Sequence, residues 1–355
     1  METGDYVKGR GAQFNPANPF SRHAYVTEHE ECLDEPLQQA PKREVFLENA
    51  KKVVNKVTSP DLSMMYSINP YQGCEHGCIY CYARNSHQYW GFSAGLDFES
   101  KLVAKKNAPE LLEKFLQNPR WKPSPVSLSG NTDCYQPLER EMRLTRGCLE
   151  VLLKHRHPVG MITKNALILR DLDLLKELAA QNLVHVYISI TTLDEAIRQK
   201  MEPRTARAGK RLEVLRKLTE AGVPCGVMAA PIIPGLNNAE IPAILEEAAK
   251  AGALTAGYTI VRLNGSVGPI FKDWLEKNFP DRAQKVWNQI CAMHGGNVND
   301  SQWRRRMHGE GHFAELTASM FRHAKARYMK ERHMPDYNTG AFIRPGKADG
   351  QLSLF

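Results

Sequence analysis

Short apolar runs alternate with helix-like segments between about residues 63 and 263 of this 355-residue chain. Such alternation predicts a parallel sheet, because parallel strands need a long crossover between them and an amphipathic helix usually supplies it. The candidate strands are Ser63–Ile68, Val126–Ser129, Val159–Thr163, Val184–Thr191, Cys225–Ile233 and Ala256–Leu263. We expect an α/β fold whose sheet is either doubly wound or curved into a partial barrel, with functional residues in the loops after the strands.

Helices are predicted between most of these strands, because apolar residues recur there three and four positions apart. The predicted crossover helices are Leu111–Gln117, Leu172–Gln181, Arg211–Ala221 and Ile241–Ala251. Gly222 and Gly252 follow the last two helices and are expected to cap them.

The two flanks of this region lack the alternation. Residues 1–60 are expected to form an irregular N-terminal extension, and residues 61–268 the sheet domain. Residues 269–355 are expected to form a helical cap and an irregular tail, with helices over Ile270–Cys291 and Phe313–Met329.

Composition limits the cellular setting and the partners. The N-terminus has no apolar signal region, and no apolar run reaches the roughly 18 residues that span a bilayer, so we expect a soluble cytoplasmic protein without a membrane partner. In such a protein the eight cysteines are thiols or metal ligands rather than disulfides. The net charge of +8 favours an anionic partner such as nucleic acid.

Three cysteines form a cluster directly after the first candidate strand. Cys74, Cys78 and Cys81 are spaced C-x3-C-x2-C on a glycine-bearing loop, whereas Cys32, Cys134, Cys148, Cys225 and Cys291 are scattered. Thiolates are the preferred ligands of iron–sulfur clusters, and three of them leave one iron of a [4Fe–4S] cluster open for a small ligand. A zinc knuckle completed by His76 or His87 is the structural alternative.

With an aromatic residue, Tyr80, before its last cysteine, this array resembles the radical S-adenosylmethionine (SAM) superfamily. The resemblance covers about residues 60–265 and implies a partial (βα)6 barrel with SAM across the carboxyl ends of the strands. Within the superfamily the chain resembles the spore photoproduct lyase-like group, which is described as DNA repair photolyases. The segments that carry this likeness are Ser129–Glu139, Ile162–Asn165, Ile188–Thr192 and Glu202–Ala206.

The resemblance implies a set of SAM contacts. Lys164 is expected to meet the SAM carboxylate, Ser189 the ribose region and Tyr80 the adenine, while Arg204 would pair with the carboxylate. The methionine amino group is expected to meet the loop residues Ser129, Gly130, Asn131, Thr132 and Asp133. Plain packing for Tyr80, solvent exposure for Lys164 and a salt bridge from Arg204 to Glu202 or Asp194 are the alternatives.

Spore photoproduct lyases carry a hydrogen-donor cysteine near the end of the second strand, where this chain has Gly130. Cys134 is the alternative catalytic donor, although a free thiol is more commonly a buried packing residue. The departure puts the photoproduct-lyase activity in doubt.

The C-terminal cap is rich in basic residues. Arginines beside an aromatic residue suit phosphate contact and base stacking, so Trp303 and the following Arg304, Arg305 and Arg306 are a candidate DNA- or RNA-binding face. A solvated helix face is the alternative.

The leading hypothesis is a radical SAM enzyme that forms a 5′-deoxyadenosyl radical and abstracts a hydrogen atom, from nucleic acid in a lyase-like repair reaction. Its expected partners are SAM, an electron donor such as flavodoxin or ferredoxin, and DNA or RNA. The competing hypotheses are a radical SAM enzyme acting on a peptide or small metabolite, and a non-catalytic nucleic-acid-binding protein with a structural metal loop.

Overall fold

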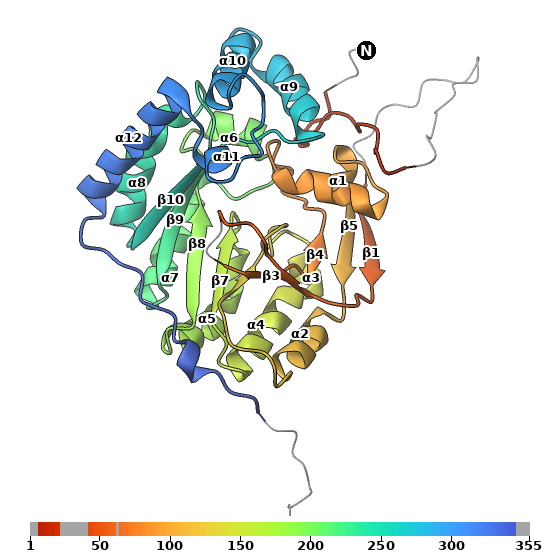
Figure 1. Ribbon diagram of the computed structural model, residues 1–355, viewed down its shortest axis with the longest axis vertical. Helices are drawn as coiled ribbons and strands as arrows, with labels where there is room; N and C mark the ends of the chain where they lie inside the picture. The colour runs from red at the N-terminus through yellow and green to blue at the C-terminus, as the bar shows by residue number, and fades with distance from the viewer. Residues whose placement is uncertain (1–5, 22–41, 62–63, 346–355) are drawn as a thin grey trace, which may run out of the picture.

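A seven-stranded sheet forms the centre of the computed structural model, which describes residues 6–21, 42–61 and 64–345 (Figure 1). Its strand order is β10-β9-β8-β7-β6-β3-β2, and every neighbouring pair runs parallel except β2 and β3. The strands are β2 (Val54–Lys56), β3 (Tyr66–Ile68), β6 (Val126–Leu128), β7 (Val159–Thr163), β8 (Val184–Ser189), β9 (Cys225–Ile232) and β10 (Thr255–Ile260).

The strands predicted from the sequence are therefore the parallel strands of this sheet, in chain order. The predicted start of the first strand, Ser63, lies outside the described residues. Because β10 and β2 stand at opposite ends of the strand order, the sheet is open, as a partial barrel requires.

Helices between successive strands pack against one face of the sheet. They are α2 (Ala108–Leu116), α4 (Leu144–Lys154), α5 (Leu172–Ala179), α7 (Ala208–Glu220) and α8 (Ile241–Lys250). Alternate residues of each strand point toward them, so that Val184, Val186 and Ile188 of β8 share a core with Leu178 and Leu215. Gly222 and Gly252 have φ of 81° and 95° and end α7 and α8 as predicted.

The N-terminal region is not wholly irregular, contrary to the prediction. β1 (Glu44–Glu48) pairs parallel with β5 (Lys101–Lys105), and β5 pairs antiparallel with β4 (Tyr71–Gln72) to form a second, three-stranded sheet. The side chains of β1 are mostly exposed. Its strand conformation therefore arises from backbone pairing with β5 rather than from an apolar pattern of its own.

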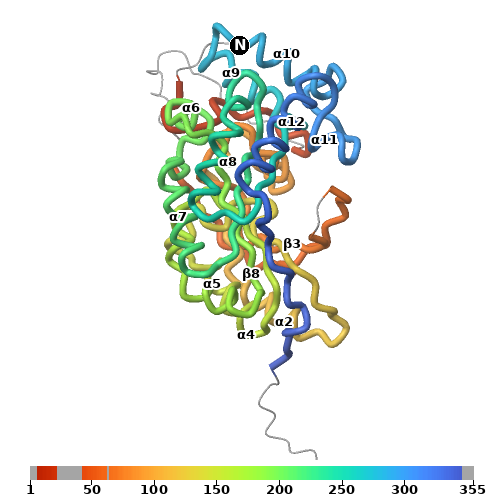
Figure 2. The backbone as a smooth tube through the Cα atoms, turned by 90° about the vertical axis from the view of Figure 1, so that its left-hand side faces the viewer, coloured from red at the N-terminus to blue at the C-terminus, as the bar shows by residue number. Residues whose placement is uncertain are grey.

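The C-terminal cap is helical, with one break that was not predicted. The expected helix Ile270–Cys291 is two helices, α9 (Val267–Asn278) and α10 (Ala283–Met293), because Pro280 between them cannot continue a helix. Two further helices follow, α11 (Arg305–His308) and α12 (Gly311–Tyr328), and α12 confirms the second expected helix. α12 lies beside α8 in both views (Figures 1 and 2).

The segment after α12 returns along the sheet toward the amino ends of the strands (Figure 2). Tyr337 stacks on His185 of β8 with ring centroids 3.8 Å apart, and the Asn338 amide donates to the Asn182 carbonyl at 3.0 Å. A side chain in place of Gly160 of β7 would lie within 2.9 Å of the Tyr337 hydroxyl. This segment therefore fills the inner face at the strand starts. Among the described residues no helix is both long and apolar enough to cross a bilayer.

A buried ion pair ties the N-terminal strap, residues 6–21, to the cysteine loop. Glu99 of α1 (Leu96–Ser100) accepts hydrogen bonds from the Gly11 and Ala12 amides at 3.1 and 2.8 Å and from Arg84 at 2.6 Å. The Arg84 Nε donates to the Cys78 carbonyl at 3.1 Å. Glu99 and Arg84 are both fully buried, so each charge depends on the other.

We predict that Glu99→Ala lowers the free energy of unfolding by about 3–5 kcal/mol, because it leaves the Arg84 charge buried and unpaired. Urea denaturation of the protein without its cofactors measures this loss. Glu213→Ala on the exposed face of α7 is the matched control and should hardly move the midpoint. Equal losses in the two variants would show that the Glu99 pair does not anchor the strap.

Candidate radical SAM active site

The cysteine loop starts at the end of β4 and is held rigidly by backbone contacts. The Cys74 amide donates to the Phe98 carbonyl at 2.9 Å and the Ile79 amide to the Met201 carbonyl at 3.0 Å. Gly73 and Gly77 have φ of 77° and 66°. At Gly77 a Cβ would lie 2.7 Å from Glu99, so only glycine fits both its conformation and the close approach.

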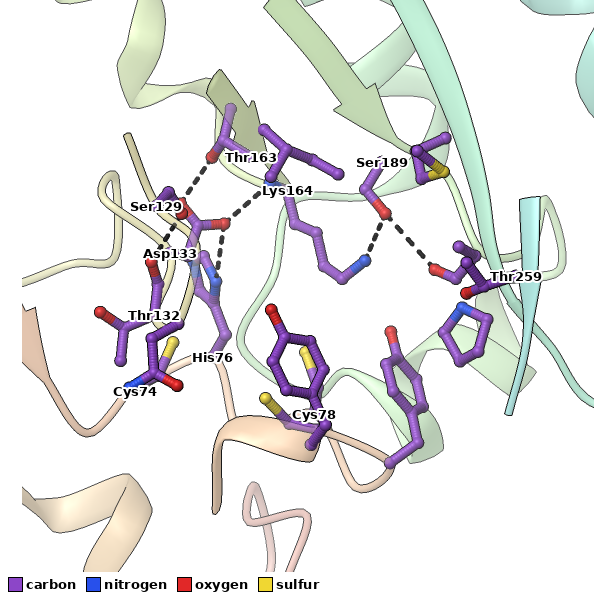
Figure 3. A pocket seen from close by; sticks show the side chains of 18 of the residues that line it. Cys74, His76, Cys78, Ser129, Thr132, Asp133, Thr163, Lys164, Ser189 and Thr259 are labelled. Atoms are coloured by element: carbon purple, nitrogen blue, oxygen red, sulfur yellow. Dashed lines mark hydrogen bonds and ion pairs between the residues drawn. The ribbon is translucent and has the colours of Figure 1, made fainter. Parts of the chain in front are cut away.

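Cys74, Cys78 and Cys81 all line one cavity of about 310 Å³ at the carboxyl ends of the parallel strands. Figure 3 shows Cys74 and Cys78 on the loop side of this cavity, facing Lys164 and Ser189 at the strand ends. Among the described cysteines these three alone line the cavity, and Cys32 lies outside the described residues. Three thiols on one loop fit a cuboidal [4Fe–4S] cluster that leaves one iron to a ligand not supplied by the chain.

The histidines proposed to complete a zinc site have other roles. His76 lines the cavity, but its Nδ1 lies 3.3 Å from Asp133 and its Nε2 lies 3.1 Å from the Asn165 amide nitrogen. His87 packs between the rings of Phe92 and Phe98, and burial lowers its pKa to about 4. His76 thus makes polar contacts with Asp133 and Asn165, and His87 packs against two aromatic rings.

The loop after β6 forms the second wall of the cavity. Ser129, Asn131, Thr132 and Asp133 line it, as predicted, whereas Gly130 does not. The carbonyl of Gly130 instead accepts a hydrogen bond from the Tyr82 hydroxyl at 2.5 Å.

Asp133 joins three segments around the cavity. Its carboxylate accepts from Thr163 Oγ1 at 2.7 Å and from the Lys164 amide at 2.8 Å, besides His76. Burial favours the neutral acid, but His76 and these hydrogen bonds outweigh it and hold the pKa of Asp133 below its usual value. The ionised carboxylate therefore positions the strand ends as well as facing the cavity.

Lys164 projects into the cavity from the end of β7 (Figure 3). Its Nζ donates to Ser189 Oγ at the end of β8 and lies 3.5 Å from the buried Glu202 carboxylate. Glu202 also accepts from Tyr80 and is paired with Arg211. Burial would raise the pKa of Glu202, but Arg211 and Lys164 hold it well below its usual range.

The charges of this group do not cancel. One carboxylate, Glu202, stands against two cations, Lys164 and Arg211, while the Asp133 carboxylate accepts from the backbone amide of Lys164 and pairs with His76. A carboxylate added at the Lys164 ammonium would offset the second cation of this group. This wall is therefore suited to the carboxylate of an amino-acid ligand.

Two predicted site residues lie elsewhere. Arg204 is exposed and donates to the Gly9 carbonyl at 3.1 Å, while Arg211 forms the salt bridge to Glu202 that was the alternative for Arg204. Cys134 is fully buried in the core with Cys148 and Leu149 and does not line the cavity. The geometry supports neither the SAM contact of Arg204 nor the hydrogen-donor role of Cys134.

Two of the three arginines in the basic run Arg304–Arg306 are paired within the protein. Arg305 pairs with Asp300 and Glu310, and Arg306 pairs with Asp61. Trp303 is 52% exposed, but the Arg306 guanidinium covers its ring at 4.0 Å. The predicted phosphate contacts of Arg305 and Arg306 would therefore have to compete with existing ion pairs.

Tyr82, Arg262 and Met307 are among the cavity residues that sequence reasoning did not name as site residues. Tyr82 directly follows the last cluster cysteine and Arg262 follows β10, so chain position pointed to both. Met307 lies on α11, and its place depends on how the cap folds back over the sheet.

A parallel sheet that holds three thiols, a lysine and buried carboxylates at its carboxyl edge defines a cofactor-dependent α/β enzyme. The comparisons identify the family. Residues 68–248 match the Radical SAM superfamily, to which this chain belongs. Its cofactors are therefore a [4Fe–4S] cluster and SAM.

The chain is also similar to individual proteins and to a solved structure. An uncharacterized protein of Mycobacterium tuberculosis is 34% identical over 65% of this chain and 69% of its own length. An uncharacterized protein of Methanocaldococcus jannaschii is 31% identical over 70% of this chain and 89% of its own length. Spore photoproduct lyase in complex with dinucleoside spore photoproduct shares the fold, with a TM-score of 0.58 over 83% of this chain and 86% of that chain, at 14% identity.

We predict that Cys78→Ala, reconstituted without oxygen, loses most of its iron, because a cuboidal cluster with two thiolate ligands is labile. Iron content and absorbance near the cluster bands measure this loss. Cys291→Ala on α10 should retain the iron of the wild type. Full iron in Cys78→Ala would contradict the cluster assignment.

Lys164→Met should weaken SAM binding by about tenfold or more, because it removes the cation that offsets the SAM carboxylate. The dissociation constant of SAM is compared with that of Lys154→Met, a surface variant on α4. Iron content should be unchanged in both. Equal dissociation constants would mean that Lys164 does not bind SAM.

Proposed function

We propose that this enzyme cleaves SAM reductively and abstracts a hydrogen atom from a nucleic-acid substrate. One observation carries the proposal: the three cluster cysteines converge with Lys164 and Ser189 on one cavity at the carboxyl ends of the parallel strands. When bound, the cluster supplies the electron that cleaves SAM to methionine and a 5′-deoxyadenosyl radical, which takes a hydrogen atom from the substrate. We further propose that a flavodoxin or ferredoxin provides this electron.

The residues of the chain bind and orient SAM in this proposal. Lys164 would hold its carboxylate, Ser189 would face its ribose, and Tyr80, held by its hydrogen bond to Glu202, would contact its adenine. Met228, Ile260 and Met307 provide apolar walls that limit water near the reacting atoms.

The nucleic-acid substrate is supported by the likeness to spore photoproduct lyase, whose structure holds a dinucleoside photoproduct, and by the net charge of +8. The position of Cys134 argues against a reaction in which that thiol returns the hydrogen atom. The proposed reaction is therefore hydrogen abstraction from the substrate, without a lyase step. The internal pairing of Arg305 and Arg306 favours the second candidate, a peptide or small-metabolite substrate.

Deuterium transfer tests the proposal. Dithionite-reduced enzyme should convert SAM to 5′-deoxyadenosine and methionine, and a perdeuterated DNA oligonucleotide, irradiated or not, should place deuterium in the 5′-deoxyadenosine. Mass spectrometry reads both results, and the Cys78→Ala protein is the control for unspecific cleavage. Absence of 5′-deoxyadenosine would refute radical SAM activity. Deuterium arriving only from deuterated peptides or metabolites would establish the second candidate instead.

A further inference from the structure

Arg262 follows β10 and lines the active-site cavity. It is only partly accessible, and burial lowers its pKa, as does the nearby Arg306. An arginine nevertheless stays charged in a protein, so its five N–H donors need acceptors.

In the part of the chain that the structure describes, no carboxylate lies within ion-pair distance of Arg262, and no hydrogen-bond acceptor is assigned to it. The ring of Tyr82 lies near it, with its centroid 5.9 Å from the guanidinium carbon. Asp61 is near enough to affect it electrostatically but is bound to Arg306 and to the Arg304 amide. Other arginines with shielded head groups are paired: Arg84 with Glu99, Arg170 with Glu139, Arg198 with Glu195 and Arg211 with Glu202.

The cavity therefore has two cationic regions. Lys164 and its neighbours form one, beside the cysteine loop, and they suffice for the carboxylate of SAM. Arg262 forms the other, at the end of β10, with Tyr82 and Met307 as its neighbours in the cavity wall. A partly buried guanidinium that is not paired with a carboxylate keeps its donors available to an anionic ligand in the cavity.

We infer that Arg262 is the substrate-anchoring residue of this site and that it binds a phosphodiester group of the substrate. The inference rests on the proposed function and deepens it. A guanidinium fork matches two phosphate oxygens, and the ring of Tyr82 beside it offers a face on which a base stacks. A dinucleotide anchored there would share the cavity with SAM bound at Lys164, because both residues line it.

Binding to the reconstituted, SAM-loaded enzyme tests this inference without turnover. The probes are the dinucleoside monophosphate thymidylyl-thymidine and its uncharged methylphosphonate analogue, and equilibrium dialysis gives their dissociation constants. Arg262→Gln should weaken binding of the phosphodiester by about 10- to 100-fold, the usual loss for a charged hydrogen-bonded pair. It should alter binding of the methylphosphonate far less. Arg262→Lys, which keeps the charge but loses the fork, should fall between wild type and Arg262→Gln.

Arg282→Gln, an exposed arginine before α10, is the matched control and should bind both probes as the wild type does. Wild-type enzyme that does not bind the phosphodiester, or a loss of equal size for both probes, would overturn the inference. The inference would also be overturned if an acidic dipeptide bound the wild type and lost affinity to the same extent in Arg262→Gln. That result would indicate a carboxylate substrate. A rise in the SAM dissociation constant as large as that of the phosphodiester would assign Arg262 to SAM.

The result is separable from that for the proposed function. If 5′-deoxyadenosine forms but the phosphodiester probe does not bind, the anchoring role of Arg262 fails while radical SAM activity stands. If the probe binds through Arg262 but no 5′-deoxyadenosine forms, the activity fails and the anion site stands.

Discussion

The parallel pairing of the strands is the constraint on which the site depends. Because β3, β6, β7, β8, β9 and β10 run in one direction, their carboxyl ends meet at one edge of the sheet. Their helices cover one face, and the segment around Tyr337 fills the opposite face near the strand starts. The cavity is thereby confined to the carboxyl ends, where the cysteine loop also lies.

Two buried carboxylates, Asp133 and Glu202, hold the segments at this edge of the sheet together around the cavity. Asp133 connects the loop after β6 with the start of the loop after β7 and with His76 of the cysteine loop. Glu202 connects Tyr80 of the cysteine loop with Lys164 and with Arg211 of α7. Asp133 and Glu202 each join segments that are distant in the chain, so these contacts form only when those segments have folded together.

Local patterns in the sequence predicted the features that depend on local order. The parallel strands, the crossover helices and the cysteine array each have a periodicity or spacing of their own. By contrast, β1 forms because β5 is available to pair with it, and its exposed side chains show no strand pattern. The helix α4 was missed because Arg146 and Gly147 interrupt its apolar spacing, yet Cys148, Leu149 and Leu152 are buried against the sheet.

The site residues divide in the same way, into those that a local feature of the sequence predicts and those whose place depends on the complete fold. Lys164 and Ser189 were predicted from their place at strand ends together with the family resemblance, and both line the cavity. Arg204 and Arg211 are seven positions apart in one loop-to-helix segment, and only the fold decides which faces Glu202. Cys134 directly follows a cavity residue, but the chain turns after Asp133 and places the thiol in the core.

Charge shows most clearly why a sequence count is an incomplete guide to binding. The excess of positive residues suggested that the basic run Arg304–Arg306 is the anion-binding face, but acidic partners from distant segments occupy Arg305 and Arg306. Electrostatic attraction for an incoming anion depends on cations that the fold leaves without a carboxylate and shields from water. Arg262 is partly buried and has no carboxylate within ion-pair distance in the described part of the chain, although no basic cluster surrounds it in the sequence. The pairing of charges in the fold, rather than their density along the chain, therefore determines which cations remain available to an anion.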